Sequence, residues 1–161
     1  MKKLMSMGVV SLVATALVLS ATASRAQGRA VGDDTRDRFV GAWRLAWLEE
    51  PGPDGNIHRA DCTGMFVFTG DGHASVQVMY RTPQAGAAAA PVQYAQGGYE
   101  ATFGRYQVDA SARTFTYHVE GALVRSLIGK DLVRSYEFSG NELIVKSSDA
   151  KERWRVAWEH Y

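Results

Sequence analysis

The sequence predicts an all-β fold: a single antiparallel barrel of about eight strands, preceded by a signal peptide. Short apolar runs recur at regular spacing between Arg36 and Trp158, and turn residues separate them. No part of the mature chain sustains an amphipathic helical period for more than about two turns. With 161 residues, the chain is long enough for one domain and too short for two of ordinary size.

Residues 1–26 have the organisation of a cleavable signal peptide. Two lysines precede an apolar stretch from Met7 to Leu19, and small residues then lead to Ala26. We expect cleavage after Ala26, with Gln27 as the new N-terminus. An uncleaved membrane anchor is the alternative, but a span needs about 20 continuous apolar residues and this stretch is shorter. The sequence therefore predicts no integral membrane span after cleavage.

Residues 27–38 are expected to be a flexible polar lead, and residues 39–161 to form the barrel domain. Its expected strands combine apolar runs or period-two alternation with turn residues at their ends. In chain order they are residues 43–47, 65–69, 74–80, 103–108, 115–120, 132–138, 143–146 and 154–158. Closing such a sheet into a barrel removes its exposed edges. A barrel of about eight strands is either filled by side chains or holds one small ligand.

The segment 81–98 interrupts this pattern. It contains Pro83, four consecutive alanines, Pro91 and the pair Gly97-Gly98. A connection of this length in a compact domain is often a lid or a binding loop. A disordered Ala/Gly-rich insertion is the other interpretation.

Composition excludes several classes of function. The chain has 18 basic and 17 acidic residues, and residues 1–26 take away three basic ones, which leaves 15 against 17, or −2. No nucleic-acid partner is expected, because binding phosphates requires clustered positive charge. The single cysteine, Cys62, excludes an intramolecular disulfide. The four histidines show no metal-ligand spacing and no nucleotide motif is present, so we expect no metal and no cofactor.

An ordered set of motifs resembles the bacterial lipocalin-like domain family of the calycin group. The motifs are Gly41-Ala42-Trp43-Arg44-Leu45, Thr69-Gly70-Asp71-Gly72-His73, Gly104-Arg105-Tyr106-Gln107-Val108, Tyr117-His118-Val119-Glu120-Gly121, Val133-Arg134-Ser135-Tyr136-Glu137 and Trp154-Arg155. The resemblance runs from Phe39 to Trp158 and implies a closed antiparallel barrel with a central cavity. Lipocalins place an arginine from the end of the chain across the tryptophan of the first strand. Arg153 and Arg155 are the candidates here, but strand parity points both outward.

His118 and Glu120 share one face of an expected strand. If this face lines the cavity, an imidazole and a carboxylate converge on the ligand and can act as acid and base. In the opposite arrangement Phe115, Tyr117 and Val119 fill the interior, and the two polar residues meet solvent. Both arrangements stay open at this point, and His118 and Glu120 are candidates for catalysis and for ligand binding.

The other candidate ligand-binding residues are aromatic or polar residues within expected strands: Trp43, Gln77, Arg105, Tyr106, Arg134 and Tyr136. A polar group in a mostly apolar pocket orients a ligand, and an arginine suits a carboxylate. Arg105 or Arg134 can therefore hold a fatty-acid-like ligand. A surface salt bridge is the alternative for either arginine.

These features favour an exported protein, periplasmic or secreted, that binds or carries a small hydrophobic molecule in its barrel cavity. One alternative is a cavity enzyme of the cyclase or isomerase type that uses His118 and Glu120, by analogy with adapted lipocalin-like barrels. The other is a structural envelope protein with a filled barrel. The interior distinguishes the three, because only the first two need a cavity and only the enzyme needs an acid and a base inside it.

Overall fold

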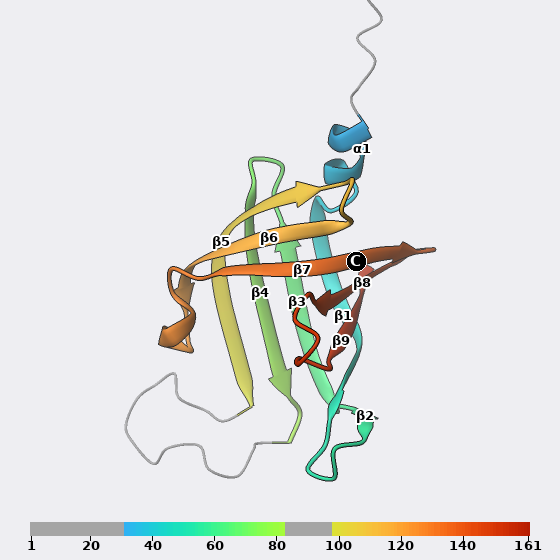
Figure 1. The fold of residues 1–161 in the computed structure, drawn as a ribbon, viewed down its shortest axis with the longest axis vertical. Coiled ribbons are helices and arrows are strands. Elements are labelled where there is room, and N and C mark those ends of the chain that lie inside the picture. Colours follow the sequence, from blue (N-terminus) through green and yellow to red (C-terminus); the bar gives the residue numbers. More distant parts are fainter. Residues whose placement is uncertain (1–30, 83–97) are drawn as a thin grey trace, which may run out of the picture.

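An antiparallel sheet closes into a barrel in the computed structural model, which describes residues 31–82 and 98–161 (Figure 1). Its strands are β1 (Gly41–Pro51), β2 (Ile57–Arg59), β3 (Cys62–Phe68), β4 (His73–Tyr80), β5 (Tyr99–Asp109), β6 (Thr114–Ala122), β7 (Asp131–Ser139), β8 (Glu142–Ser147) and β9 (Arg155–His160). From β3 to β9 each strand pairs with the next, and β1 pairs with both β3 and β9. The predicted closed barrel of eight strands is confirmed.

Three short elements stand outside the eight barrel strands: α1 (Val31–Asp37), the 3-10 helix η1 (Arg125–Leu127) and β2, which extends the sheet beside the end of β1. The alternation did not predict β2, because all three of its residues are exposed. Helix α1 lies within residues 27–38, for which a flexible lead was expected, and the flexibility of this lead stays a prediction. Neither described helix has the length and apolarity needed to cross a membrane.

Two predicted segments fall mainly outside the described residues. The signal peptide belongs to residues 1–30, and most of the segment 81–98 belongs to residues 83–97. Cleavage after Ala26 and the role of the Ala/Gly-rich segment therefore stay predictions.

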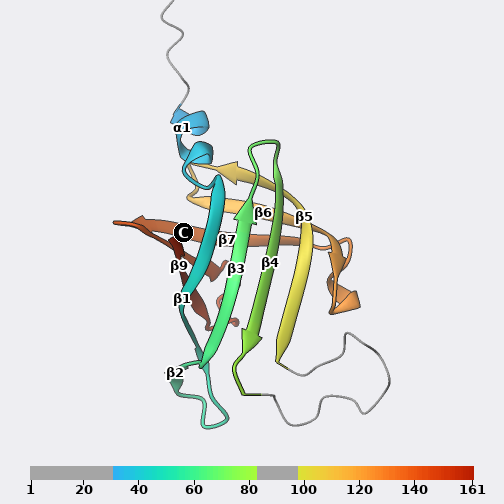
Figure 2. The same cartoon turned by 180° about the vertical axis from the view of Figure 1, so that it is seen from behind.

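Helix α1 lies at one end of the barrel (Figures 1 and 2). Aromatic rings fill the interior next to it. Phe39, which follows α1, is fully buried. Its ring centroid lies 4.9 to 6.2 Å from those of Phe68, Tyr106, Phe115, Tyr136 and Phe138. Most of these pairs meet edge to face, the arrangement that aromatic quadrupoles favour. This half of the interior is therefore packed with side chains.

A bulge in β1 reverses the face that the second half of the strand presents. The pairing with β9 shifts between Leu45 and Trp47. Trp43 faces the interior, whereas the Trp47 ring lies between the guanidinium groups of Arg59 and Arg155, each 5.3 Å from its centroid. One extra residue moves every later side chain to the opposite face. Trp47 therefore lies on the face opposite to Trp43, although unbroken alternation along residues 43–47 would place both on one face.

The prediction that Arg155 points outward is confirmed. Its guanidinium Nε lies 2.6 Å from an oxygen of Glu49, and it covers Trp47 on the outer face. Trp43 is instead covered by His160, whose ring centroid lies 4.0 Å away. The last strand thus contacts the first tryptophan through a histidine.

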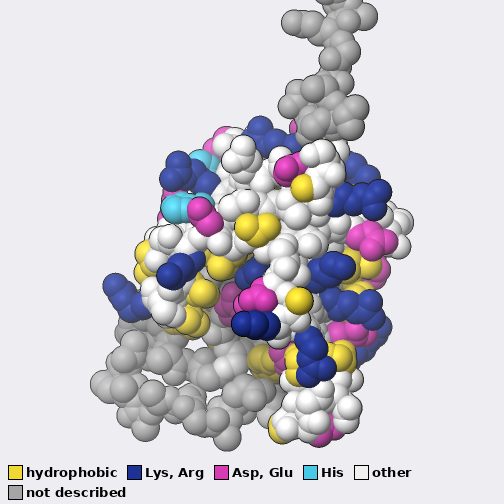
Figure 3. Space-filling model, in the orientation of Figure 1, with side chains coloured by type: hydrophobic (Ala, Val, Ile, Leu, Met, Phe, Trp, Pro, Cys, Tyr) yellow, Lys and Arg dark blue, Asp and Glu magenta, His cyan; other side chains and the backbone are white. Residues whose placement is uncertain are grey.

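Charged side chains of both signs are mixed over the surface shown in Figure 3. Many pair across neighbouring strands, as Arg44 does with Glu159 at 2.6 Å and Arg105 with Glu120 at 2.7 Å. Exposed pairs of this kind contribute at most about 1 kcal/mol each. Most of the stability of the barrel therefore comes from the buried apolar side chains of its interior.

Candidate functional site

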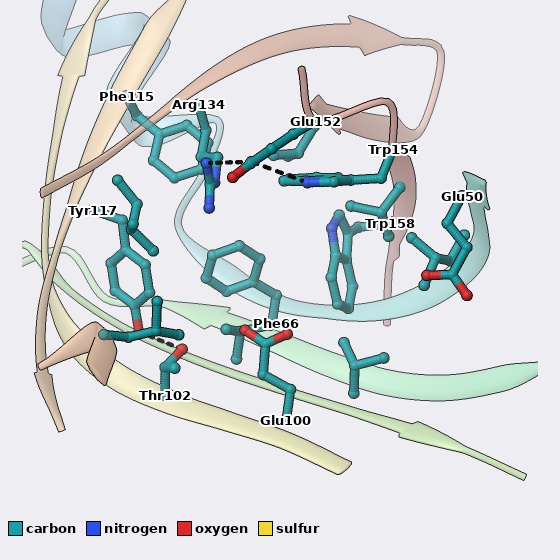
Figure 4. Close-up of a pocket in the computed structure, with 17 residues that line it drawn as sticks. Glu50, Phe66, Glu100, Thr102, Phe115, Tyr117, Arg134, Glu152, Trp154 and Trp158 are labelled. Carbon is teal, nitrogen blue, oxygen red and sulfur yellow. Dashed lines mark hydrogen bonds and ion pairs between the residues drawn. The ribbon is translucent and has the colours of Figure 1, made fainter. Parts of the chain in front are cut away.

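The half of the barrel away from α1 contains a partly open cavity of about 330 Å³ (Figure 4). Most of its wall is apolar and comes from seven of the barrel strands and η1: Leu48, Phe66, Val76, Val78, Phe115, Tyr117, Leu127, Leu132, Val145, Val156 and Trp158, with Trp154 just before β9. Sites for small molecules have volumes from about 300 Å³ upward and are mostly apolar. The interior thus holds packed rings at one end and a ligand-sized space at the other.

Four charged side chains among the described residues line this cavity: Glu50, Glu100, Arg134 and Glu152. Nη1 of Arg134 lies 3.6 Å from Oε2 of Glu152, and its guanidinium lies 5.0 Å from the ring centroid of Trp154. Burial lowers the pKa of Arg134, and the charges of Glu152 and Glu100 oppose that shift. Because an arginine ordinarily titrates above about pH 12, Arg134 remains a cation.

The carboxylates of Glu50 and Glu100 lie in different surroundings. Glu50 accepts a hydrogen bond from the Tyr80 hydroxyl, and burial together with this carboxylate raises the pKa of Tyr80. Glu100 stands at the start of β5, and its carboxylate points into the cavity (Figure 4). Within residues 31–82 and 98–161, no hydrogen bond or ion pair reaches the Glu100 carboxylate. The residue as a whole is exposed, but nearby protein atoms partly desolvate the carboxylate and raise its pKa, and the charge of Arg134 opposes this shift.

Two polar side chains in the wall bond to each other. The Tyr117 hydroxyl donates to Oγ1 of the buried Thr102 over 3.2 Å, and burial raises the pKa of Tyr117 to about 12. Both groups are therefore neutral at ordinary pH.

Unlike Tyr117 and Thr102, Trp158 has an unpaired polar group: its indole Nε1 is buried without a hydrogen-bond partner in the described part of the chain. Leaving a buried donor unpaired costs about 1–3 kcal/mol. The Trp158 side of the wall therefore lacks an acceptor.

His118 and Glu120 lie on the outer face of β6, away from the cavity. His118 Nδ1 is 2.6 Å from Oδ1 of Asp131 on β7, and Glu120 pairs with Arg105 on β5. Phe115, Tyr117 and Val119 are buried on the opposite face, because their large apolar surfaces gain most from leaving water. The hypothesis that His118 and Glu120 converge on a ligand in the cavity is therefore wrong.

Of the other candidate binding residues, Arg134 alone lines the cavity. Trp43, Tyr106 and Tyr136 belong to the buried core and pack at the closed end of the barrel. Gln77 and Arg105 lie on the outer face, where Gln77 donates to Ser75 over 3.1 Å.

Three acidic residues of the cavity were missed from sequence. Glu50 faces inward because of the bulge in β1, and Glu152 reaches the cavity from the turn before β9. Glu100, Thr102 and Tyr106 are separated by even numbers of residues, so they share the inner face of β5. The sequence-based strand begins at residue 103, and extending it backward would have placed Glu100 on this face. No group of three or more possible metal ligands occurs in the described residues.

The chain matches a known family of domains. The sequence model of a family described as a lipocalin-like domain matches residues 40–160. A lipocalin-like protein from Bacteroides uniformis ATCC 8492 is 15% identical, with a TM-score of 0.46 over 77% of this chain and 99% of that chain. An uncharacterized protein from Bacteroides eggerthii DSM 20697 is 13% identical, with a TM-score of 0.45 over 76% and 99%. A search of curated proteins finds no match. Because the family match spans the whole barrel from β1 to β9, the chain belongs to the lipocalin-like domain family.

Proposed function

We propose that this protein binds a small, mostly apolar molecule inside its barrel. The observation that carries the proposal is the cavity of about 330 Å³, which begins where the aromatic packing around Phe39 ends. Protein interiors are ordinarily close-packed, so a partly open space of this size inside the barrel is a feature to be explained. Membership of a lipocalin-like family supports a binding role for it.

The cavity wall can hold such a molecule by burial of apolar surface. Contacts with Phe66, Val76 and Leu132 remove apolar ligand surface from water, which contributes about 25 cal/mol per Å². The packed rings at the other end of the barrel limit how deep a ligand enters. The depth of the open half therefore restricts the length of the ligand.

The observed interior weighs against both alternative functions. The acid–base pair of the cavity-enzyme alternative lies on the outer face of β6. The alternative of a structural envelope protein requires a filled barrel, but only the half beside α1, where Phe39 packs, is filled with side chains. Binding is the function that uses the open half.

We further propose that binding takes place in the bacterial envelope. This rests on the signal-peptide pattern of residues 1–26. N-terminal sequencing of the protein from the envelope fraction should return Gln27. Finding Met1 there would overturn cleavage and with it the proposed periplasmic or secreted location.

Native mass spectrometry of the protein purified from its own host tests ligand binding. We expect an additional mass that is lost on denaturation. Val78→Phe, which fills part of the cavity, should abolish this mass, whereas Met79→Phe should retain it, because Met79 is the next residue on β4 and faces outward with 45% of its surface exposed. A wild-type protein without additional mass, or retention by Val78→Phe, would contradict binding in the cavity.

A further inference from the structure

We propose that the bound molecule carries a protonated amine and that Glu100 is its counter-ion. This inference rests on the proposed function, because it names the chemical class of the ligand held in the same cavity. It departs from the sequence-based expectation of a fatty-acid-like ligand held by an arginine.

The charges of the cavity wall favour a cation. Three carboxylates and one guanidinium line it, which gives 1 − 3 = −2 when all are ionised. Arg134 is already paired, since Glu152 lies 3.6 Å from it and its flat face lies over Trp154. A carboxylate ligand would add a further negative charge to a site of low dielectric, where like charges repel strongly. Arg134 therefore does not make this cavity an acid-binding site.

Among the described residues, Glu100 is a cavity-lining acid without a hydrogen-bond or ion-pair partner in the protein. Glu50 has the Tyr80 hydroxyl and Glu152 has Arg134, whereas the Glu100 carboxylate meets no hydrogen-bond donor among the described residues. It projects from β5 into the cavity opposite Val78 (Figure 4). Glu100 is exposed at the start of β5, so water reaches its carboxylate, and an ammonium group that replaces this water supplies both a charge and N–H donors.

The rest of the wall fits an amine with an apolar body. Phe66, Tyr117 and Trp158 present aromatic rings around the same space, and aromatic faces attract organic cations. Independently, the buried Nε1 of Trp158 has no acceptor in the described structure. An oxygen of the bound molecule, or a water held with it, would supply this acceptor. An exposed carboxylate and a buried indole N–H, neither with a partner in the described structure, thus line the same cavity.

Calorimetric titration of the mature protein with three matched probes tests the inference. Phenylbutylamine, phenylbutanol and phenylbutyrate share one skeleton and differ in charge at neutral pH. We expect the amine to bind about tenfold more tightly than the alcohol, which corresponds to about 1.4 kcal/mol, and the carboxylate to bind most weakly. Equal binding of amine and alcohol, or tightest binding of the carboxylate, would overturn the amine inference while leaving ligand binding intact. If none of the three binds, the proposed function fails as well.

The variant Glu100→Gln assigns the preference to one residue. It should reduce the ratio of amine to alcohol affinity to about one while keeping alcohol affinity within about twofold, which also shows that the barrel is folded. Glu137→Gln is the matched control, because Glu137 is exposed on the outer face of β7 and its loss changes the total charge equally. An unchanged ratio in Glu100→Gln, or an equal drop in Glu137→Gln, would overturn the role of Glu100.

Discussion

The indole nitrogen of Trp43 donates a 2.7 Å hydrogen bond to the backbone carbonyl of Phe39. This bond ties the chain that leaves α1 to the first strand and holds the Phe39 ring over one end of the barrel. The aromatic cluster around Phe39 ends where the cavity begins. The residues just before β1 therefore contribute the central ring of the packed half of the barrel.

Truncation of this ring should be costly. We expect Phe39→Ala to lower the free energy of unfolding by about 3–5 kcal/mol, because it removes a fully buried aromatic side chain from among five other rings. Urea unfolding followed by circular dichroism measures the change. Tyr161→Ala is the control, since 74% of Tyr161 is exposed, and it should cost less than about 0.5 kcal/mol. Equal losses in both variants would contradict the role of Phe39 as the closure of the barrel.

The sequence predicted the barrel well because its signal is carried by many residues at once. In β6, three buried apolar residues alternate with polar ones, so a single local exception does not change the assignment. The alternation left open which face of β6 points into the barrel. In the structure Phe115 and Tyr117 point inward, because burying their apolar surface stabilises the fold more than burying the polar face would.

The cavity was much harder to predict, because its polar residues depend on irregular features. The bulge in β1 leaves no mark in the alternation, yet it turns Trp47 outward and Glu50 inward. Glu152 lies in no strand, and only the path of its turn brings it to Arg134. Such placements arise from contacts between distant segments, which period-two patterns do not encode.

The turn between β3 and β4 should show a strongly shifted carboxyl group. The hydroxyl of Thr69 and the side chain of His73 bond to Asp71 and lower the pKa of its carboxyl to about 2. Because this value lies below the ordinary one of about 3.9, the folded state is favoured above the ordinary pKa, and this contribution is lost as the pH falls through 2. NMR titration should show that Thr69→Ala raises the pKa of Asp71 towards its ordinary value.

Asp109 provides the control for this titration. Its pKa is lowered by Ser111 and by the backbone of Ala112, in the turn between β5 and β6. Thr69→Ala should leave it unchanged. An Asp71 pKa that does not respond to Thr69→Ala would contradict the assigned cause.

Cys62 should react slowly with thiol reagents in the folded protein. The residue is 8% exposed, and burial, together with the charges of Glu50 and Asp61, raises the pKa of its thiol. Since the thiolate is the reactive form, labelling with Ellman's reagent at pH 8 should be much slower than for a free cysteine and should accelerate in urea. Rapid labelling of the folded protein would contradict this burial.

Reductant should leave the melting temperature of the protein unchanged, because a chain with one cysteine forms no intramolecular disulfide.

The outer position of His118 predicts that its loss leaves ligand binding intact. His118 pairs with Asp131 on the surface of the barrel, so His118→Ala removes an exposed pair and should lower the free energy of unfolding by less than about 1 kcal/mol. Titration of tryptophan fluorescence with phenylbutylamine should give the same affinity as the wild type within about twofold. Val78→Phe should abolish binding in the same assay, because it occupies the cavity that His118 does not reach. If His118→Ala instead weakens binding while Val78→Phe has no effect, the ligand is held on the outer face of β6 and not inside the barrel.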